Sequence, residues 1–292
     1  MPSAPAYTLS DLLDAYTQDY LPLLAPQTQT HRRYFFGWLR TDLGAVPLAQ
    51  LSEVILTTWK RQLLTRYKHG SVRTYLGALN TVLNVGVHLR WLERNPLTQV
   101  VKPRQSPWRK RFLTEEELPR LLRACEQSRQ AALVPVVHIA LATGLRKQEI
   151  LRLRWPLVDL ARGLLSIPQT KNGEGKAVHI PQITVEVLQA WQRRRRFDVD
   201  LVFPRPDGTQ PIYIDVCWTL AVKRAGLQDM VFHDLRHTTG SYLAMSGATA
   251  REIAEVLGHK TLALAHRYSH LTMTYTAALV DRMADKFLPA HR

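Results

Sequence analysis

Cysteine is almost absent from this chain of 292 residues, which has only Cys125 and Cys217. Two cysteines so far apart, in segments with a helical pattern, supply neither a CxxC metal site nor a disulfide framework, so we expect two buried thiols. Long apolar runs are also missing: the most apolar stretch, residues 131–142, is interrupted by Pro135 and His138 and is too short to cross a bilayer. Without a leader pattern at its start, the chain is expected to be cytoplasmic, with no membrane partner.

Acidic residues are scarce. The chain has 24 Asp and Glu against 39 Lys and Arg, which gives a net charge of +15. Such an excess is typical of proteins that bind a polyanion. Arginine supplies 29 of the basic residues, and a guanidinium group can bind a phosphate in a bidentate manner. The charge leaves DNA, RNA and acidic surfaces open as partners, whereas 46% hydrophobic residues exclude a disordered or fibrous chain.

Helical periodicity fills the first third of the chain. Thr8 and Asp11 are spaced as a capping box, and Ser71 after Gly70 is the expected N-cap of a later helix. Residues 1–104 carry 12 basic and 6 acidic side chains, which predicts a small all-helical domain with a positive face. The helices are expected at 8–21, 28–43, 56–67 and 71–92.

A basic segment that ends at Arg111 follows, with the sequence VKPRQSPWRKR. Its two prolines and lack of apolar periodicity predict an interdomain linker at 105–111, with a second domain at 112–292. The second domain mixes elements, which makes the predicted fold class mainly α with a small antiparallel β-sheet. Two strands at 164–169 and 176–181 flank the turn sequence 171–175. Helices are expected at 114–126, 131–142, from about 146, 184–196 with Arg193 to Arg196 at its C-terminal end, 212–225, and throughout after 232.

Two arginines in this second domain are placed to bind an anion. Arg146 follows the helix break at Gly144 and falls in the first turn of the next helix, where backbone N–H groups can help it to bind phosphate. An ordinary ion pair with Glu149 is the alternative. His233 and Arg236 are three residues apart, so a helix places them on one face. A surface helix with an unrelated His and Arg is the alternative there.

Three further residues could take part in phosphate chemistry. Lys171 enters the hairpin turn and could protonate a leaving group, unless it is simply solvated. His259 directly follows Gly258, the expected C-cap of a helix with a capping box at its start. Tyr268 is either a half-buried packing residue or a nucleophile, and a nucleophilic phenol, with a pKa near 10, needs a base and nearby cations.

Five histidines gather in the last part of the chain, which raises the question of a metal site. There is no HExxH motif and no neighbouring cysteine. We therefore expect no catalytic metal. The histidines are His233, His237, His259, His266 and His270.

Five sequences, ATGLRKQEI, QTKNGEGK, HDLRH, LGHK and HRYSHL, resemble in this order the motifs of the tyrosine recombinase (phage integrase) family. The resemblance covers nearly the whole chain. Residues 1–104 resemble the family's helical core-binding (SAM-like) DNA-binding domain, and 112–292 resemble its catalytic domain. HRYSHL is closer to phage-type integrases than to the Xer branch. Lys147 and Gln148 depart from the family pattern, and the front end is expected to lack an arm-binding domain.

The resemblance implies a site-specific DNA recombinase that needs no metal, ATP or other cofactor. Its partners would be double-stranded DNA recombination sites. Arg146 and Arg236 would hold the non-bridging oxygens of the scissile phosphate, and His259 would donate a hydrogen bond to that phosphate.

The remaining implied residues transfer protons and form the covalent bond. Tyr268 would attack phosphorus to give a 3′-phosphotyrosine, while His233 assists removal of the phenolic proton. Lys171 would protonate the departing 5′ oxygen. A 5′ hydroxyl of a partner strand would then reverse the step.

The family acts as a tetramer, and the tail at 275–287 offers a contact for it. Ala278, Leu279, Met283 and Phe287 fall near one face of a helical pattern, which predicts docking on a neighbouring protomer. Packing on its own domain is the alternative.

Two other functions remain open for this fold. One is a DNA-binding regulator that has lost strand transfer, because a fold does not establish an activity. The other is a topoisomerase-like enzyme that nicks and reseals DNA without exchanging partners.

Overall fold

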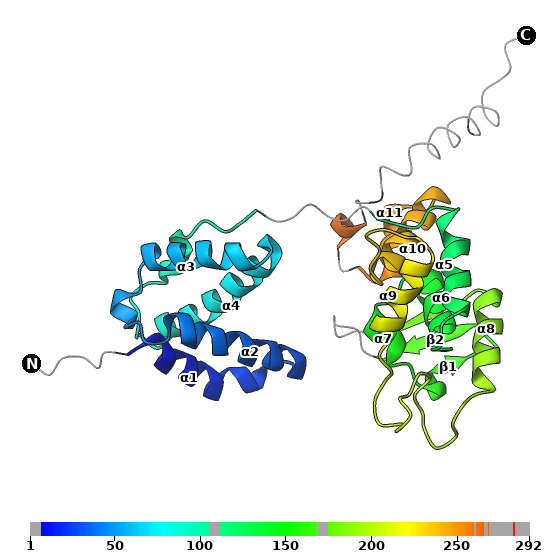
Figure 1. The fold of residues 1–292 in the computed structure, drawn as a ribbon, viewed down its shortest axis with the longest axis horizontal. Coiled ribbons are helices and arrows are strands. Elements are labelled where there is room, and N and C mark those ends of the chain that lie inside the picture. The colour runs from blue at the N-terminus through cyan, green and yellow to red at the C-terminus, as the bar shows by residue number, and fades with distance from the viewer. Residues whose placement is uncertain are drawn as a thin grey trace, which may run out of the picture. The chain divides into compact units, whose positions relative to one another are not determined.

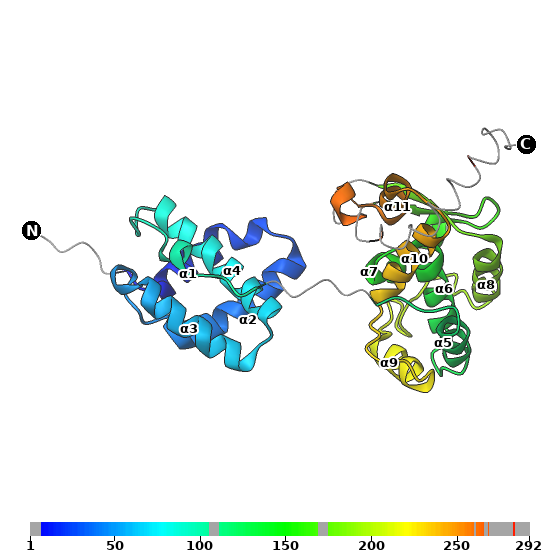
Figure 2. The same ribbon diagram turned by 90° about the horizontal axis from the view of Figure 1, so that it is seen from above.

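The computed structural model describes residues 7–104, 111–168, 175–259, 261–265, 268 and 283. The chain divides into two compact units, Met1–Trp108 and Arg109–Arg292 (Figures 1 and 2). Each unit has its own hydrophobic core. The described elements are mostly helices, together with one three-stranded antiparallel sheet. The predicted fold class is therefore confirmed.

The first unit is built from helices alone in its described part. α1 packs against α2 and α4, and α3 packs against α4. The capping box at the start of α1 is present as predicted, because the Thr8 hydroxyl accepts from Asp11 N and the Asp11 carboxylate accepts from Thr8 N. The elements are α1 (Leu9–Asp19), η1 (Leu21–Leu23), α2 (Pro26–Leu43), η2 (Leu48–Gln50), α3 (Glu53–Arg66), α4 (His69–His88) and η3 (Pro96–Gln99).

The starts of α2, α3 and α4 differ from the prediction. α2 begins at Pro26, two residues early. α4 begins at His69 with Lys68 as its N-cap, so the expectation of Ser71 as the cap is wrong. The first N–H groups of a helix have no intrahelical partner, so Gly70 is tolerated in the first turn. α3 begins three residues early because the Ser52 hydroxyl accepts a hydrogen bond from Ile55 N.

The second unit is arranged around α6, whose residues are nearly all apolar. α6 packs against α5, α7, α8 and α10, as Figure 1 shows. α8 ends at Gln192, and the four arginines that follow lie beyond its last turn. The helices are α5 (Glu117–Glu126), α6 (Leu133–Thr143), α7 (Lys147–Leu151), η4 (Trp155–Leu157), α8 (Gln182–Gln192), α9 (Asp215–Arg224), α10 (Asp234–Met245), α11 (Ala250–Leu257) and η5 (Leu262–Leu264).

The sheet has the order β1-β2-β3, with β1 (Val158–Asp159), β2 (Leu164–Ile167) and β3 (Lys176–His179). Leu165 pairs with Val178, and Ile167 pairs with Lys176. The two predicted strands are confirmed in shorter form. β1 was not predicted, because a two-residue strand shows no periodicity. Residues 171–174 of the predicted turn, and Lys171 with them, lie outside the described residues.

α11 forms a small core of its own beside the main one. Its capping box between Thr249 and Glu252 and its left-handed C-cap at Gly258 are present as predicted. This second core contains Ala244, Ile253, Ala254, Leu257, Ala265 and Tyr268. Of the predicted docking residues of the tail, only Met283 is among the described residues, and it is exposed. None of the described helices has the length and apolarity of a membrane span.

The C-terminal ends of α6 and α11 meet at a glycine. Gly144 caps α6 in the left-handed region, with φ of 61°, and a Cβ at this position would overlap Cδ2 of Leu257 in the last turn of α11. Only a residue without a side chain combines this backbone conformation with so close a contact.

We predict that Gly144→Ala lowers the free energy of unfolding by about 2–4 kcal/mol, since it adds steric overlap to the cost of a left-handed Ala. Gly226→Ala is the control. Its φ is also in the left-handed region, at 67°, but a Cβ there would come no closer than 3.7 Å to a neighbour, Nη1 of Arg120. Urea unfolding of both variants separates the two costs. An equal loss in both would show that the contact with Leu257 contributes nothing.

Candidate active site

A buried arginine joins the C-terminal ends of α6 and α11. Arg236, in the first turn of α10, is only 5% exposed. Its Nη1 donates to Gly144 O at 2.7 Å and its Nη2 donates to Leu257 O. Carbonyl groups at helix C-termini carry partial negative charge and lack intrahelical donors, so a cation stabilises both ends at once. A guanidinium held through two nitrogens is fixed in position and orientation.

Arg146 follows this junction by two residues, as the N-cap of α7. The Glu149 carboxylate accepts from Arg146 N at 2.8 Å and from its Nη1 at 2.9 Å. The predicted i,i+3 ion pair is therefore present. The side chain of Arg146 is 34% exposed and that of Glu149 is 10% exposed, so the pair fixes Arg146 while part of its guanidinium still reaches the surface. Because Arg236 binds Gly144 O, the fold brings the two predicted arginines to one place.

Lys147, which departs from the family pattern, directly follows Arg146 in the chain. Its Nζ donates to the Asp215 carboxylate at 2.6 Å, at the N-terminal end of α9. This exposed ion pair connects α7 to α9. It contributes little to stability, because the median exposed pair is worth about 0–1 kcal/mol.

Lys176 is a third cation at the junction, and the sequence analysis missed it. Its Nζ donates to Val256 O at 3.3 Å, one residue before the carbonyl that Arg236 binds. The end of α11 thus accepts from two basic side chains, one on β3 and one on α10. Burial lowers the pKa of Lys176, and the charges of Arg236 and Arg146 lower it further, while Glu149 acts in the opposite direction.

Tyr268 lies against α10, beside His237 and Gly240. The side chain is 4% exposed, and its Oη is 3.1 Å from Nδ1 of His237. The sequence analysis singled out His237 only as a possible metal ligand. The ring of His233 packs edge-to-face on that of His237, with centroids 5.2 Å apart. The rings of His233, His237 and Tyr268 therefore form a chain of contacts beside α10, and each ring carries an exchangeable proton.

The two other predicted histidines lie at ends of helices. His233 is exposed and is the N-cap of α10. His259 is half-buried, and its backbone N donates to Ala254 O at 2.8 Å, directly after the end of α11 that Arg236 and Lys176 bind. In the described part of the chain, no group of three or more His, Cys, Asp or Glu side chains could hold a metal ion.

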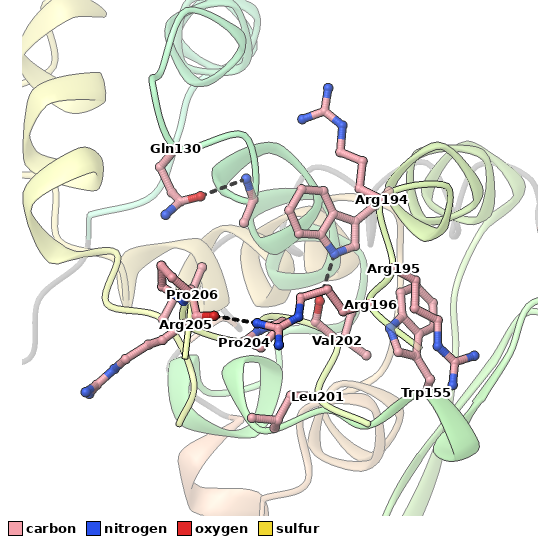
Figure 3. A pocket seen from close by; sticks show the side chains of 13 residues that line it. Gln130, Trp155, Arg194, Arg195, Arg196, Leu201, Val202, Pro204, Arg205 and Pro206 are labelled. Carbon is pink, nitrogen blue, oxygen red and sulfur yellow. Dashed lines mark hydrogen bonds between the residues drawn. The ribbon is translucent and has the colours of Figure 1, made fainter. Parts of the chain in front are cut away.

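A cavity of about 240 Å³ lies elsewhere in the second unit and contains none of the predicted site residues (Figure 3). Arginines line it, and two of them, Arg196 and Arg205, donate to groups within the fold. Arg196 forms an ion pair with Asp198 at 2.7 Å and donates to Pro206 O. Arg205 donates to Pro211 O and stacks on the Tyr213 ring at 4.1 Å. We therefore place the candidate active site at the Arg146–Arg236 junction.

The family model described as the phage integrase family matches residues 111–274. The shufflon-specific DNA recombinase of Escherichia coli is 33% identical over 72% of this chain. This chain spans about half of that relative, 53% of its length. Tyrosine recombinase XerC of Mycobacterium sp. (strain JLS) is 27% identical over 94% of this chain and 98% of that protein.

Solved structures show the same fold at low identity. A Tn1549 transposon integrase in complex with a circular intermediate DNA has a TM-score of 0.78 and 17% identity, and covers 95% of this chain and 100% of the solved one. A lambda integrase tetramer bound to a Holliday junction has a TM-score of 0.76 and 18% identity, and covers 90% and 78%.

Replacing the buried Arg236 should destabilise the chain more than replacing the partly exposed Arg146. We predict that Arg236→Met costs about 3 kcal/mol, because a hydrogen bond to a charged group is worth about 1.5–3 kcal/mol. Arg146→Met should cost less than about 1 kcal/mol, since its ion pair is partly exposed. Urea unfolding measures both. Similar losses in the two variants would contradict the bridging role of Arg236.

Lys176 should give the stability a distinct pH dependence. A lysine with a lowered pKa holds fewer protons in the folded chain than in the unfolded one, between that pKa and the usual value of about 10.4. In this window the free energy of unfolding of the wild type should therefore rise with pH relative to that of Lys176→Met. Urea unfolding at pH 7.5 and pH 10 tests this, with the exposed Lys223→Met as control. A difference between wild type and Lys176→Met that stays constant with pH would refute it.

Proposed function

Because this chain belongs to the phage integrase family, we propose that it is a site-specific tyrosine recombinase that cuts and rejoins double-stranded DNA in the cytoplasm. One arrangement carries the proposal: Arg236 binds Gly144 O, Arg146 follows that glycine by two residues, and Tyr268 packs against α10, the helix that carries Arg236. Two fixed guanidinium groups suit the non-bridging oxygens of a phosphodiester. A phenol that packs against the helix of Arg236 can act as the nucleophile.

Cleavage in this proposal is an exchange of one phosphodiester for another. Tyr268 Oη forms a bond to phosphorus while the bond to the 5′ oxygen breaks, which leaves a 3′-phosphotyrosine. Arg146 and Arg236 neutralise the charge that builds up on the phosphate oxygens, and His259 adds a hydrogen bond. Because the link conserves the phosphodiester, a 5′ hydroxyl can attack it and restore the DNA without ATP or a metal.

Two protons must move in each direction. The 5′ oxygen leaves as a hydroxyl, and Lys171 is the proposed donor. The phenolic proton of Tyr268 leaves toward the imidazoles of α10, where His233 is the histidine that the family resemblance names. On rejoining, both transfers run in reverse.

The assembly in this proposal is a tetramer on two DNA duplexes. A lambda integrase with the same fold forms a tetramer on a Holliday junction. Leu279, Met283 and Phe287 of the tail would dock on a neighbouring protomer. The helical first unit, with 12 basic side chains within residues 1–104, would hold the DNA with the catalytic unit.

A nicked DNA that traps the cleaved state tests the proposal. The DNA carries sequence that flanks the chain's own gene, and the reaction contains EDTA. We predict a covalent protein–DNA adduct with the wild type and none with Tyr268→Phe, which keeps the ring but lacks the nucleophilic oxygen. The adduct is measured as a slowly migrating band after denaturation.

Other results would favour the alternative functions. Specific DNA binding with no adduct at any flanking sequence would contradict the recombinase and favour a silent regulator. An adduct together with plasmid relaxation, but with no exchange between two duplexes, would favour a topoisomerase-like enzyme. An adduct that persists in Tyr268→Phe would assign the nucleophile to another residue.

A further inference from the structure

The hydroxyl of Tyr268 contacts a histidine that the family resemblance does not assign to catalysis. His237 Nδ1 lies 3.1 Å from Tyr268 Oη, within the reach of a general base. His237 directly follows Arg236 in α10, so the residue that bridges α6 and α11 and the residue that contacts the nucleophile share one helical turn. Any movement of α10 would shift both together.

The shape of α10 fixes the phenol beside this histidine. A Cβ at Gly240 would lie 2.5 Å from Cζ of Tyr268 and 2.8 Å from its Oη. The end of the phenol therefore rests on the helix backbone at Gly240, one turn after His237. The ring also belongs to the small core that contains Ala244 and Leu257.

His233 lies one turn earlier on α10, and its ring contacts that of His237. Its ring packs on His237 with centroids 5.2 Å apart, and the ring of His237 is 6.4 Å from that of Tyr268. His233 is also exposed at the start of the helix, whereas His237 is half-buried. Among the described residues, His237 is the imidazole within hydrogen-bond distance of the phenolic oxygen.

We propose that His237 is a catalytic residue that accepts the phenolic proton of Tyr268 during cleavage and returns it during rejoining. This inference rests on the proposed recombinase function. A neutral imidazole with its proton on Nε2 presents Nδ1 as an acceptor.

The proton transfer balances with the bond changes at phosphorus. As the Oη–P bond forms and the bond to the 5′ oxygen breaks, the phenolic proton moves to Nδ1 and His237 becomes an imidazolium. The 5′ oxygen takes its proton from the proposed acid, Lys171. In rejoining, the incoming 5′ hydroxyl gives its proton to that lysine, and His237 returns its proton to the released phenolate.

The test compares wild type with His237→Asn and His233→Asn by the single-turnover rate of adduct formation on the nicked DNA, from pH 5.5 to 9. Asparagine keeps a hydrogen-bonding group near the position of Nδ1 but does not accept a proton. We expect His237→Asn to react about 10²–10⁴-fold more slowly than wild type, with unchanged DNA affinity. The fall in wild-type rate toward acidic pH should be absent in this variant.

A more acidic nucleophile separates proton transfer from simple positioning. Difluorotyrosine in place of Tyr268 ionises at lower pH and needs less help from a base. It should restore much of the rate lost in His237→Asn, and restore less in His233→Asn. Thermal unfolding of each variant shows whether the chain remains folded.

Two outcomes would overturn the role of His237. A rate for His237→Asn within about threefold of wild type would exclude proton transfer, because a positioned base contributes at least about 10²-fold. A slow rate at every pH without rescue by difluorotyrosine would leave His237 with a structural role only. Absence of an adduct from the wild type is the separate result that would contradict the recombinase function, and with it this inference.

Discussion

The hydrogen bonds of Arg236 to Gly144 O and Leu257 O are the contact on which the rest of the site depends. Two helices end at the same point, and their terminal carbonyls would repel each other without a cation between them. The guanidinium replaces this repulsion with attraction on both sides. Arg146 lies two residues after the anchored Gly144. The end of α11 lies opposite, and His259 follows directly after that end.

The same contact explains why three basic side chains lie close together at a partly buried site. Burial lowers the pKa of Lys176, and Arg236 and Arg146 are close enough to lower it further. The helix ends and Glu149 offset part of this repulsion within the protein. A phosphodiester would offset more of it, so the energetic cost of gathering the cations favours binding of an anion. The stability of the fold and the affinity of the site are therefore coupled.

Local signals predicted the fold well where the chemistry lies within a few residues. The capping boxes at Thr8 and Thr249 and the break at Gly144 follow from neighbouring side chains alone, and the structure confirms all three. The N-cap assigned to Ser71 was wrong, because a helix can begin one turn earlier when its first N–H groups reach other partners or water.

The site itself depends on contacts between distant segments, which a single sequence does not record. Glu149 beside Arg146 could be predicted from spacing. The placement of Lys176 at the end of α11 depends on how β3 packs. The contact between His237 and Tyr268 spans 31 residues, and only the absence of a side chain at Gly240 hinted that a group lies against α10.

The most direct test of this account is a crystal structure of the chain trapped covalently on nicked DNA. We predict a 3′-phosphate on Tyr268, with both arginines donating to its oxygens while Arg236 keeps its hydrogen bonds to Gly144 O and Leu257 O. A phosphate attached to another residue, or an Arg236 that has left either carbonyl in order to reach the phosphate, would contradict it.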